Sequence, residues 1–214
     1  LFDLFEGEPG HSVGTVFETL DDRWWFINPP TGFKPYPCCG STFAAVDTAL
    51  DLHERGIDVD DVESVTVTEH QQRLDHTNRP EPTTGLEGKF SVQYCVALAL
   101  ATGDVWLDDF TDEAVRNGPG LVGRVDAVAD GDAIPNDRSA RIVVEMADGS
   151  EHERTVEHPY GSPNDPMGDD ALDDKYRRCA GDALDGAAVD ASLDAIRDIE
   201  NVEHVADVLD HLTR

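Results

Sequence analysis

Apolar side chains recur at helical spacing in two segments of the first half of the chain. Ser41 or Thr42 predicts the N-cap of a helix that runs to about Arg55, and Gly56 predicts its end. A second, strongly apolar helix is expected over residues 88–101, where a glycine follows shortly afterwards. Further helical patterns predict helices over residues 112–117, 169–184, 188–200 and 204–212.

Four segments have the composition and alternation of strands. Residues 62–70 alternate apolar and polar side chains, as in a half-buried strand, and residues 122–128 predict a second strand. Residues 141–146 and 153–156 predict a hairpin, because an Asp-Gly pair between them supplies a tight turn. These elements predict an α+β fold: an antiparallel sheet of about four strands, with two helices on one face and a helical tail. No glycine-rich phosphate loop follows a strand, which argues against a doubly wound nucleotide-binding fold.

The chain is strongly acidic, with 45 Asp and Glu residues against 16 Lys and Arg residues and a net charge of -29. Such a field repels nucleic acid and anionic membranes, since both are bound through cationic side chains. Three tryptophans and several periodic apolar segments argue against a disordered acidic chain. We therefore expect a folded, acidic-surfaced protein of a salt-loving organism, in which ions screen the self-repulsion. Only three lysines are present, Lys34, Lys89 and Lys175.

The sequence also indicates where the chain is located. No apolar run is long enough to cross a membrane, and the N-terminus lacks the basic and apolar regions of a signal peptide. No Cys-x-x-Cys pair suggests a zinc site, so we expect reduced thiols, a cytoplasmic protein and no metal. The first residue is Leu1 rather than Met, and we expect the chain to be part of a longer protein.

Four short motifs occur in order along nearly the whole chain. They are KPYPCC at 34–39 leading into AAVD at 44–47, GKFSVQY at 88–94, HPYGSPNDP at 158–166 and LDDKY at 172–176. In this order they resemble the C-terminal half of the MmgE/PrpD family. That family includes 2-methylcitrate dehydratase, cis-aconitate decarboxylase and iminodisuccinate epimerase.

The resemblance implies an enzyme of two domains, a large all-helical domain and a smaller α+β lid over the cleft. Residues 1–14 would then end the helical domain, residues 15–160 would form the lid, and residues 161–214 would be C-terminal helices returning to the helical domain. The N-terminal helical half, absent from this sequence, would be a partner and would carry further catalytic residues. A homodimer is also expected.

The activity implied by the resemblance is that of a lyase acting on a small di- or tricarboxylic acid, most similar to 2-methylcitrate dehydratase. The reaction would begin with proton abstraction next to a carboxylate and would need no cofactor, and this chain would carry part of the site. Two alternatives stay open at this point. One is an isomerase, epimerase or decarboxylase of the same family, and the other is a non-catalytic, lid-like interaction module.

Lys34 and His76 are the candidate catalytic residues. Proton abstraction next to a carboxylate needs a cation or donor facing the developing enolate-like charge, and Lys34 precedes a predicted helix N-terminus, where anions are favoured. A surface lysine is the alternative. His76 lies in the polar segment 71–87, which predicts a loop, at a position where decarboxylase-like relatives place a tyrosine facing the substrate. A solvent-exposed loop histidine is its alternative.

Three further residues are candidates for substrate binding. Cys39 occupies the position where decarboxylases of the family carry a histidine. Arg79 is a candidate for bidentate pairing with a substrate carboxylate, and an exposed surface arginine next to a proline is an equally supported alternative. Tyr94 lies near a predicted helix N-terminus, where it is expected to approach the cleft, with core packing as the alternative. Phe43 stands where relatives often carry a histidine, and Phe cannot transfer a proton, which argues against a decarboxylase.

Overall fold

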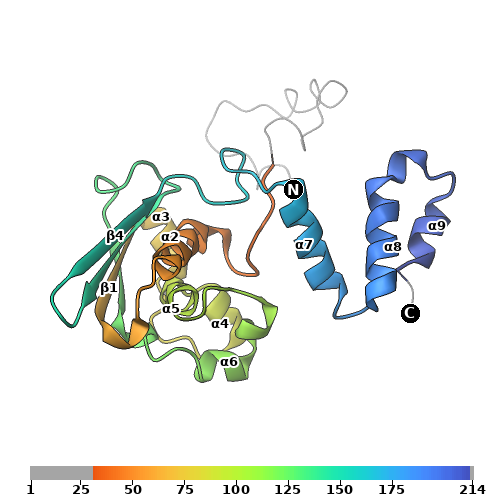
Figure 1. Ribbon diagram of the computed structural model, residues 1–214. Helices are drawn as coiled ribbons and strands as arrows, with labels where there is room; N and C mark the ends of the chain where they lie inside the picture. Colours follow the sequence, from red (N-terminus) through yellow and green to blue (C-terminus); the bar gives the residue numbers. More distant parts are fainter. Residues whose placement is uncertain (1–30, 213–214) are drawn as a thin grey trace, which may run out of the picture.

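The computed structural model describes residues 31–212 (Figure 1). The α+β part contains a four-stranded sheet covered by helices (Figure 1). The three C-terminal helices lie beside the α+β part, on the side away from its sheet (Figure 1). The expected segment 1–14, and the beginning of the expected lid up to residue 30, lie outside the described residues. No helix between residues 31 and 212 is long and apolar enough to cross a membrane.

The sheet is mixed, which corrects the expectation of an antiparallel one. Its strands are β1 (Val62–Glu69), β2 (Val125–Ala129), β3 (Ala140–Met146) and β4 (Glu151–Val156), in the spatial order β2-β1-β3-β4. β3 pairs antiparallel with both β1 and β4, whereas β1 and β2 are parallel. A parallel neighbour requires a long crossover, and the helices between β1 and β2 provide it.

Two helices, α2 (Phe43–Glu54) and α5 (Val92–Thr102), pack on each other and against one face of the sheet (Figure 1). α2 contacts β3 and β4, and α5 contacts β2. The inward side chains of β1 and β3, among them Val65, Val67 and Ile142, are fully buried beneath them. α5 is buried on nearly all sides, which explains why its sequence is apolar all round rather than striped.

The polar segment after β1 is helical where a loop was expected. α3 (Gln71–Thr77) begins at His70, whose imidazole Nδ1 accepts from the backbone N–H of Gln72. α4 (Gly85–Lys89) begins with a capping box, in which Thr84 and Glu87 satisfy each other's backbone N–H groups. Both helices are short and contain few apolar residues, so the spacing of apolar residues gives no signal for them.

The expected helix over 88–101 is interrupted. α4 ends at Lys89, and Ser91 then caps α5 by accepting from the backbone N–H of Tyr94 at 3.0 Å. α6 (Asp112–Arg116) begins at its predicted cap, Thr111. Short 3-10 helices, labelled η2 to η6 in chain order, cover Gly40–Thr42, Val59–Asp61, Leu107–Phe110, Val122–Arg124 and Ile199–Asn201.

The C-terminal helices are α7 (Asp169–Ala180), α8 (Gly186–Arg197) and α9 (Val205–Asp210), each shorter than the sequence predicts. α7 and α8 contact each other, and the hydroxyl of Tyr176 donates to the hydroxyl of Ser192 at 2.8 Å. Arg197 of α8 also pairs with Asp169 and Asp173 of α7. α7 is therefore held by α8 on one side. On another side, Lys175 and Arg178 of α7 contact the α+β part.

Candidate anion-binding site

A cavity of about 190 Å³ lies where α2 begins, between α3 and two loops. Three of its lining residues are cationic, Lys34, Arg73 and Arg138, and none is a carboxylate or a histidine. In a chain with 45 acidic residues against 16 basic ones, this concentration of positive charge is unexpected. The other lining residues are Gly32, Phe33, Gly40, Phe43, Pro159, Tyr160, Gly161, Ser162 and Pro163.

The ammonium group of Lys34 is only partly engaged by the protein. Its Nζ donates to the carbonyl oxygen of Cys38 at 3.3 Å and lies 5.9 Å from the ring centroid of Phe43. An ammonium has three donors, so two remain for a ligand after the bond to Cys38. The side chain is exposed, and its backbone carbonyl accepts from Lys175 at 2.5 Å.

Arg73, on α3, is fixed by backbone carbonyl groups rather than by a carboxylate. Its Nη1 donates to the carbonyl of Ser41 at 3.0 Å, and its Nε donates to the carbonyl of Asp137 at 2.5 Å. Between residues 31 and 212 no carboxylate lies within ion-pair distance of Lys34, Arg73 or Arg138. Their charges are therefore available to an anion in the cavity.

The two loops that wall the cavity approach each other closely. The backbone N–H of Phe33 donates to the carbonyl of Gly161 at 2.8 Å. Gly161 has φ +79°, and a Cβ there would lie 2.1 Å from the carbonyl oxygen of Phe33. A Cβ on Gly32 would lie 2.4 Å from the carbonyl oxygen of Gly161. Only glycine fits this crossing, since any side chain would separate the loops.

Asp47 of α2 joins both of these loops to the helix. Its carboxylate accepts from the hydroxyl of Tyr36 at 2.5 Å and from the backbone N–H of Tyr160 at 2.7 Å. Burial raises the pKa of Asp47 to about 6, although both hydrogen bonds act in the opposite direction. Burial, followed by the charge of Asp47, likewise raises the pKa of Tyr36 above its usual range. The sequence contains Asp47 within a motif, but its role emerges only from these contacts.

Glu69, the last residue of β1, is a fully buried carboxyl group beside the site. Neither of its oxygens has a hydrogen-bond partner in the described part of the chain. Burial raises the pKa of Glu69 to about 8, and the positive charge of Arg73 opposes this shift. Glu69 is therefore mainly protonated at neutral pH, and it leaves the charge of Arg73 uncompensated.

Two of the candidate residues do not line the cavity themselves but contact or adjoin residues next to it. His76 is exposed on the last turn of α3, and its Nε2 is 3.0 Å from the hydroxyl of Ser41, whose carbonyl group binds Arg73. Cys39 is half-buried and precedes the lining residue Gly40; its backbone N–H donates to the carbonyl of Lys89 at 2.8 Å.

The other two candidates do not line the cavity. Arg79 is exposed, and its Nε donates to the carbonyl of His76 at 3.2 Å. Tyr94 is buried in the core, where its hydroxyl donates to the carbonyl of Asp109 at 2.6 Å. Lys34 is thus brought together with Arg73 and Arg138, which lie far from it in the sequence and which no motif singles out. Within residues 31–212 no group of three or more His, Cys, Asp or Glu side chains is arranged to hold a metal ion.

Comparisons with known proteins agree with the motifs. Residues 36–201 match the MmgE/PrpD C-terminal domain. The cis-aconitate decarboxylase-like protein oryM of Aspergillus oryzae is 25% identical over 214 aligned residues, which cover 94% of this chain and 44% of that protein. The cis-aconitate decarboxylase of Homo sapiens is 23% identical over 192 residues, which cover 84% of this chain and 39% of that protein. The chain spans less than half the length of these relatives. It belongs to the MmgE/PrpD family, contains the C-terminal domain of that family and is distantly homologous to cis-aconitate decarboxylases.

Proposed function

We propose that this chain supplies the carboxylate-binding part of a lyase that acts on a small di- or tricarboxylic acid, in the manner of 2-methylcitrate dehydratase. The observation that carries the proposal is the cavity lined by Lys34, Arg73 and Arg138 without a carboxylate. A cavity of about 190 Å³ is small, and it is open enough to take one end of a polycarboxylic acid. Its charge selects anions in a protein that otherwise repels them.

Two features favour negative charge at this point. The cavity is lined by Gly40 and Phe43, where the 3-10 helix η2 runs into α2, and the positive end of the helix dipole favours anions there. The guanidinium groups of Arg73 and Arg138 are suited to hold carboxylates, because their planar donor pairs match carboxylate oxygens.

Lys34 has the role closest to the chemistry in this proposal. When a base removes the proton next to a carboxylate, negative charge develops on the carboxylate oxygens as an enolate-like intermediate forms. The free donors of the Lys34 ammonium stabilise that charge more strongly than the charge of the ground state. Departure of the hydroxide from the neighbouring carbon, protonated to water by the acid form of the base, then completes a dehydration.

A proton acceptor is not among the lining residues, since they include neither a histidine nor a carboxylate. His76 is the candidate on this chain, because it contacts the hydroxyl of Ser41, whose carbonyl oxygen binds the lining residue Arg73. An imidazole can accept a proton on one ring nitrogen, which suits the role of a general base. A second acceptor from outside the described residues is compatible with this arrangement.

Decarboxylation is the second candidate reaction, and the names of both relatives favour it. Loss of CO2 from a substrate carboxylate also leaves a carbanionic intermediate, so the same cations would serve. Phe43 argues against it, because this residue packs edge-on against Tyr36 with ring centroids 5.6 Å apart and offers no proton.

The test is turnover of 2-methylcitrate, citrate and cis-aconitate by the complete product of the gene in molar KCl. Lys34→Met is expected to lower turnover of the accepted acid about a hundredfold or more, because it removes the cation that stabilises the intermediate. Lys89→Met is the matched control, since Lys89 lies over the ring of Phe110 and does not line the cavity. Equal activities of the two variants would refute the role of Lys34.

His76→Asn separates the two catalytic roles. It is expected to lower turnover about a hundredfold or more while the affinity for the acid changes little, because a general base acts on the chemical step. An unchanged turnover would remove His76 from the mechanism and leave the carboxylate-binding proposal intact.

A further inference from the structure

One face of α7 contacts the α+β part at two places. Lys175 donates from its Nζ to the backbone carbonyl oxygen of Lys34 at 2.5 Å. Arg178, three residues later, reaches Asp104 and Trp106, which follow α5. Residues three apart lie on the same side of a helix, so these two cations form one contact surface of α7. We call Lys175 and Arg178 the α7 clamp.

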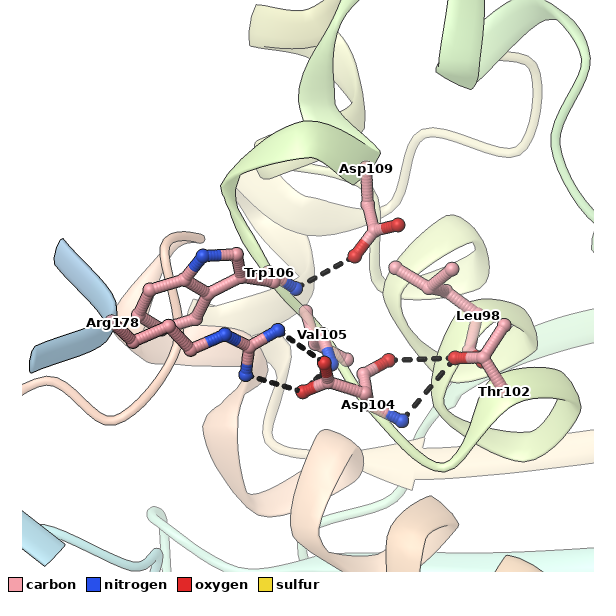
Figure 2. Close-up of polar contacts among 7 residues, drawn as sticks. All are labelled: Leu98, Thr102, Asp104, Val105, Trp106, Asp109 and Arg178. Atoms are coloured by element: carbon pink, nitrogen blue, oxygen red, sulfur yellow. Dashed lines mark hydrogen bonds and ion pairs between the residues drawn. The ribbon is translucent and has the colours of Figure 1, made fainter. Parts of the chain in front are cut away.

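The Arg178 contact is the stronger of the two. Its guanidinium lies 3.8 Å from the ring centroid of Trp106, and it forms two parallel hydrogen bonds with the carboxylate of Asp104, one of 3.1 Å (Figure 2). The pairing lowers the pKa of Asp104, chiefly through the hydrogen bonds from Arg178. Stacking and a bidentate ion pair together fix the orientation of the guanidinium. A lysine at this position could form neither the planar stacking contact nor the bidentate pair.

The partner residues of Arg178 are themselves held in place. The carboxylate of Asp104 accepts from the backbone N–H of Val105 at 2.9 Å, and the backbone N–H of Trp106 donates to Asp109 at 2.7 Å (Figure 2). Thr102, at the end of α5, donates to the carbonyl of Asp104 at 2.8 Å. Arg178 therefore anchors α7 to a rigid turn rather than to a loose loop.

We propose that Lys175 is a positioning residue for Lys34, and that Arg178 sets the place of α7 from which Lys175 acts. The segment of Lys34 is held on one side by the bond between Phe33 and Gly161. Lys175 holds it on the other side through the carbonyl of Lys34 itself. The proposal rests on the proposed function, because it concerns how the cation of the anion-binding cavity is presented to its ligand.

A direct role of Lys175 in binding the ligand is a competing account. Lys175 does not line the cavity, and its ammonium is used at the backbone of Lys34. The two accounts differ in their dependence on the Lys34 side chain. A positioning residue has no effect once the Lys34 side chain is removed, whereas a direct ligand keeps its own effect.

The three lysines allow a test that needs no ligand. A chain labelled with 13C at the lysine ε-carbons has NMR signals from Lys34, Lys89 and Lys175 alone. Lys175→Met is expected to shift or broaden the signal of Lys34 and to leave that of Lys89 in place. Arg177→Met is the matched control, because Arg177 lies on the same helix but pairs with Asp190 of α8. An unchanged Lys34 signal in Lys175→Met would overturn the proposal.

The second part of the test is citrate affinity, measured by calorimetry in molar KCl, where long-range charge effects are screened. Lys175→Met is expected to weaken citrate binding about tenfold, and Lys175→Arg to restore most of the loss. In the Lys34→Ala background, Lys175→Met is expected to have no further effect.

Arg178→Lys keeps the charge but loses stacking and bidentate geometry, and is expected to weaken binding in the same way. If the losses of citrate affinity in Lys34→Ala and Lys175→Met were additive in the double variant, Lys175 would bind the ligand directly, and the proposal that it positions Lys34 would be overturned. If the unsubstituted chain bound no citrate, the proposed function would fail, while the lysine spectrum would still decide the role of Lys175.

Discussion

Glu69→Gln isolates the energetic effect of a buried carboxyl group. Glutamine has nearly the same volume as glutamate and cannot ionise, so the substitution leaves the packing of β1 against the core in place. Glu69 is fully buried, and neither oxygen has a partner among the described residues. Its ionised form is therefore destabilised in the folded chain, and burial raises its pKa from the ordinary 4.5 to about 8.

The sign of the effect follows from proton binding. Between these two pKa values the folded chain keeps the proton on Glu69, whereas the unfolded chain has released it. The free energy of unfolding therefore falls as pH rises through this window, by about 1.4 kcal/mol per pH unit from this group. From about pH 5 to about pH 8 the total loss is about 3–4 kcal/mol. Glu69→Gln removes this pH-dependent loss, so the variant is expected to be more stable than the unsubstituted chain near pH 8.

The assay is chemical denaturation of both chains in molar KCl across this pH range. The quantity of interest is the difference in free energy of unfolding between the two chains, because other titrating groups, Asp47 among them, contribute equally to both. We expect the difference to grow in favour of Glu69→Gln as pH rises. Two stability curves that stay parallel over the whole range would refute the reasoning and show that Glu69 ionises in the folded chain as it does in water.

Three further predictions concern the walls of the cavity and the acidic surface. Gly161→Ala is expected to lower the free energy of unfolding by about 2 kcal/mol or more and to abolish citrate binding, because of the positive φ and the contact with Phe33. Gly149→Ala, with φ +82° and open space around it, should lower the free energy of unfolding by about 1 kcal/mol and leave citrate binding intact. Equal losses of citrate binding in the two variants would contradict this prediction. Tyr36→Phe removes a hydrogen bond that lowers the pKa of Asp47, so NMR titration should place that pKa above about 6, and an unchanged value would show that the bond is unimportant. The free energy of unfolding of the unsubstituted chain should rise with KCl concentration, since screening weakens repulsion within a net charge of -29, and salt-independent stability would argue against this.

Local signals in the sequence predicted those elements that depend on local interactions. The helix begun near Thr42 and ended near Gly56, the cap at Thr111 and the Asp-Gly hairpin all depend on neighbouring residues, and all are confirmed. The parallel pairing of β1 with β2 was not predicted, because alternation shows which face of a strand is buried but not which strand lies beside it.

Two misses had signals in the sequence that were available but unused. Thr84 and Glu87 have the spacing of a capping box, which marks the start of α4 within the segment that was expected to be a loop. Glu69 continues the inward register of Val65 and Val67, so its burial follows from the same alternation that predicted the strand.

The candidate site was only partly accessible from the sequence. Lys34 was identified from its motif, and the structure places it in a cationic cavity. Arg73 and Arg138 join it from α3 and from the loop before β3, and their meeting depends on tertiary packing that no short pattern encodes. The charge of the chain as a whole gave no hint of a cationic site, because composition averages over the surface.

The most direct test of the cationic cavity is calorimetric titration of citrate into this chain in molar KCl. We expect binding by the unsubstituted chain, and a loss of about tenfold or more in affinity for Lys34→Met and for Arg138→Met, each of which removes one charge from the cavity. Lys89→Met should bind citrate like the unsubstituted chain. Binding that is absent, or that is equal in all four chains, would contradict the claim that Lys34, Arg73 and Arg138 form a carboxylate site.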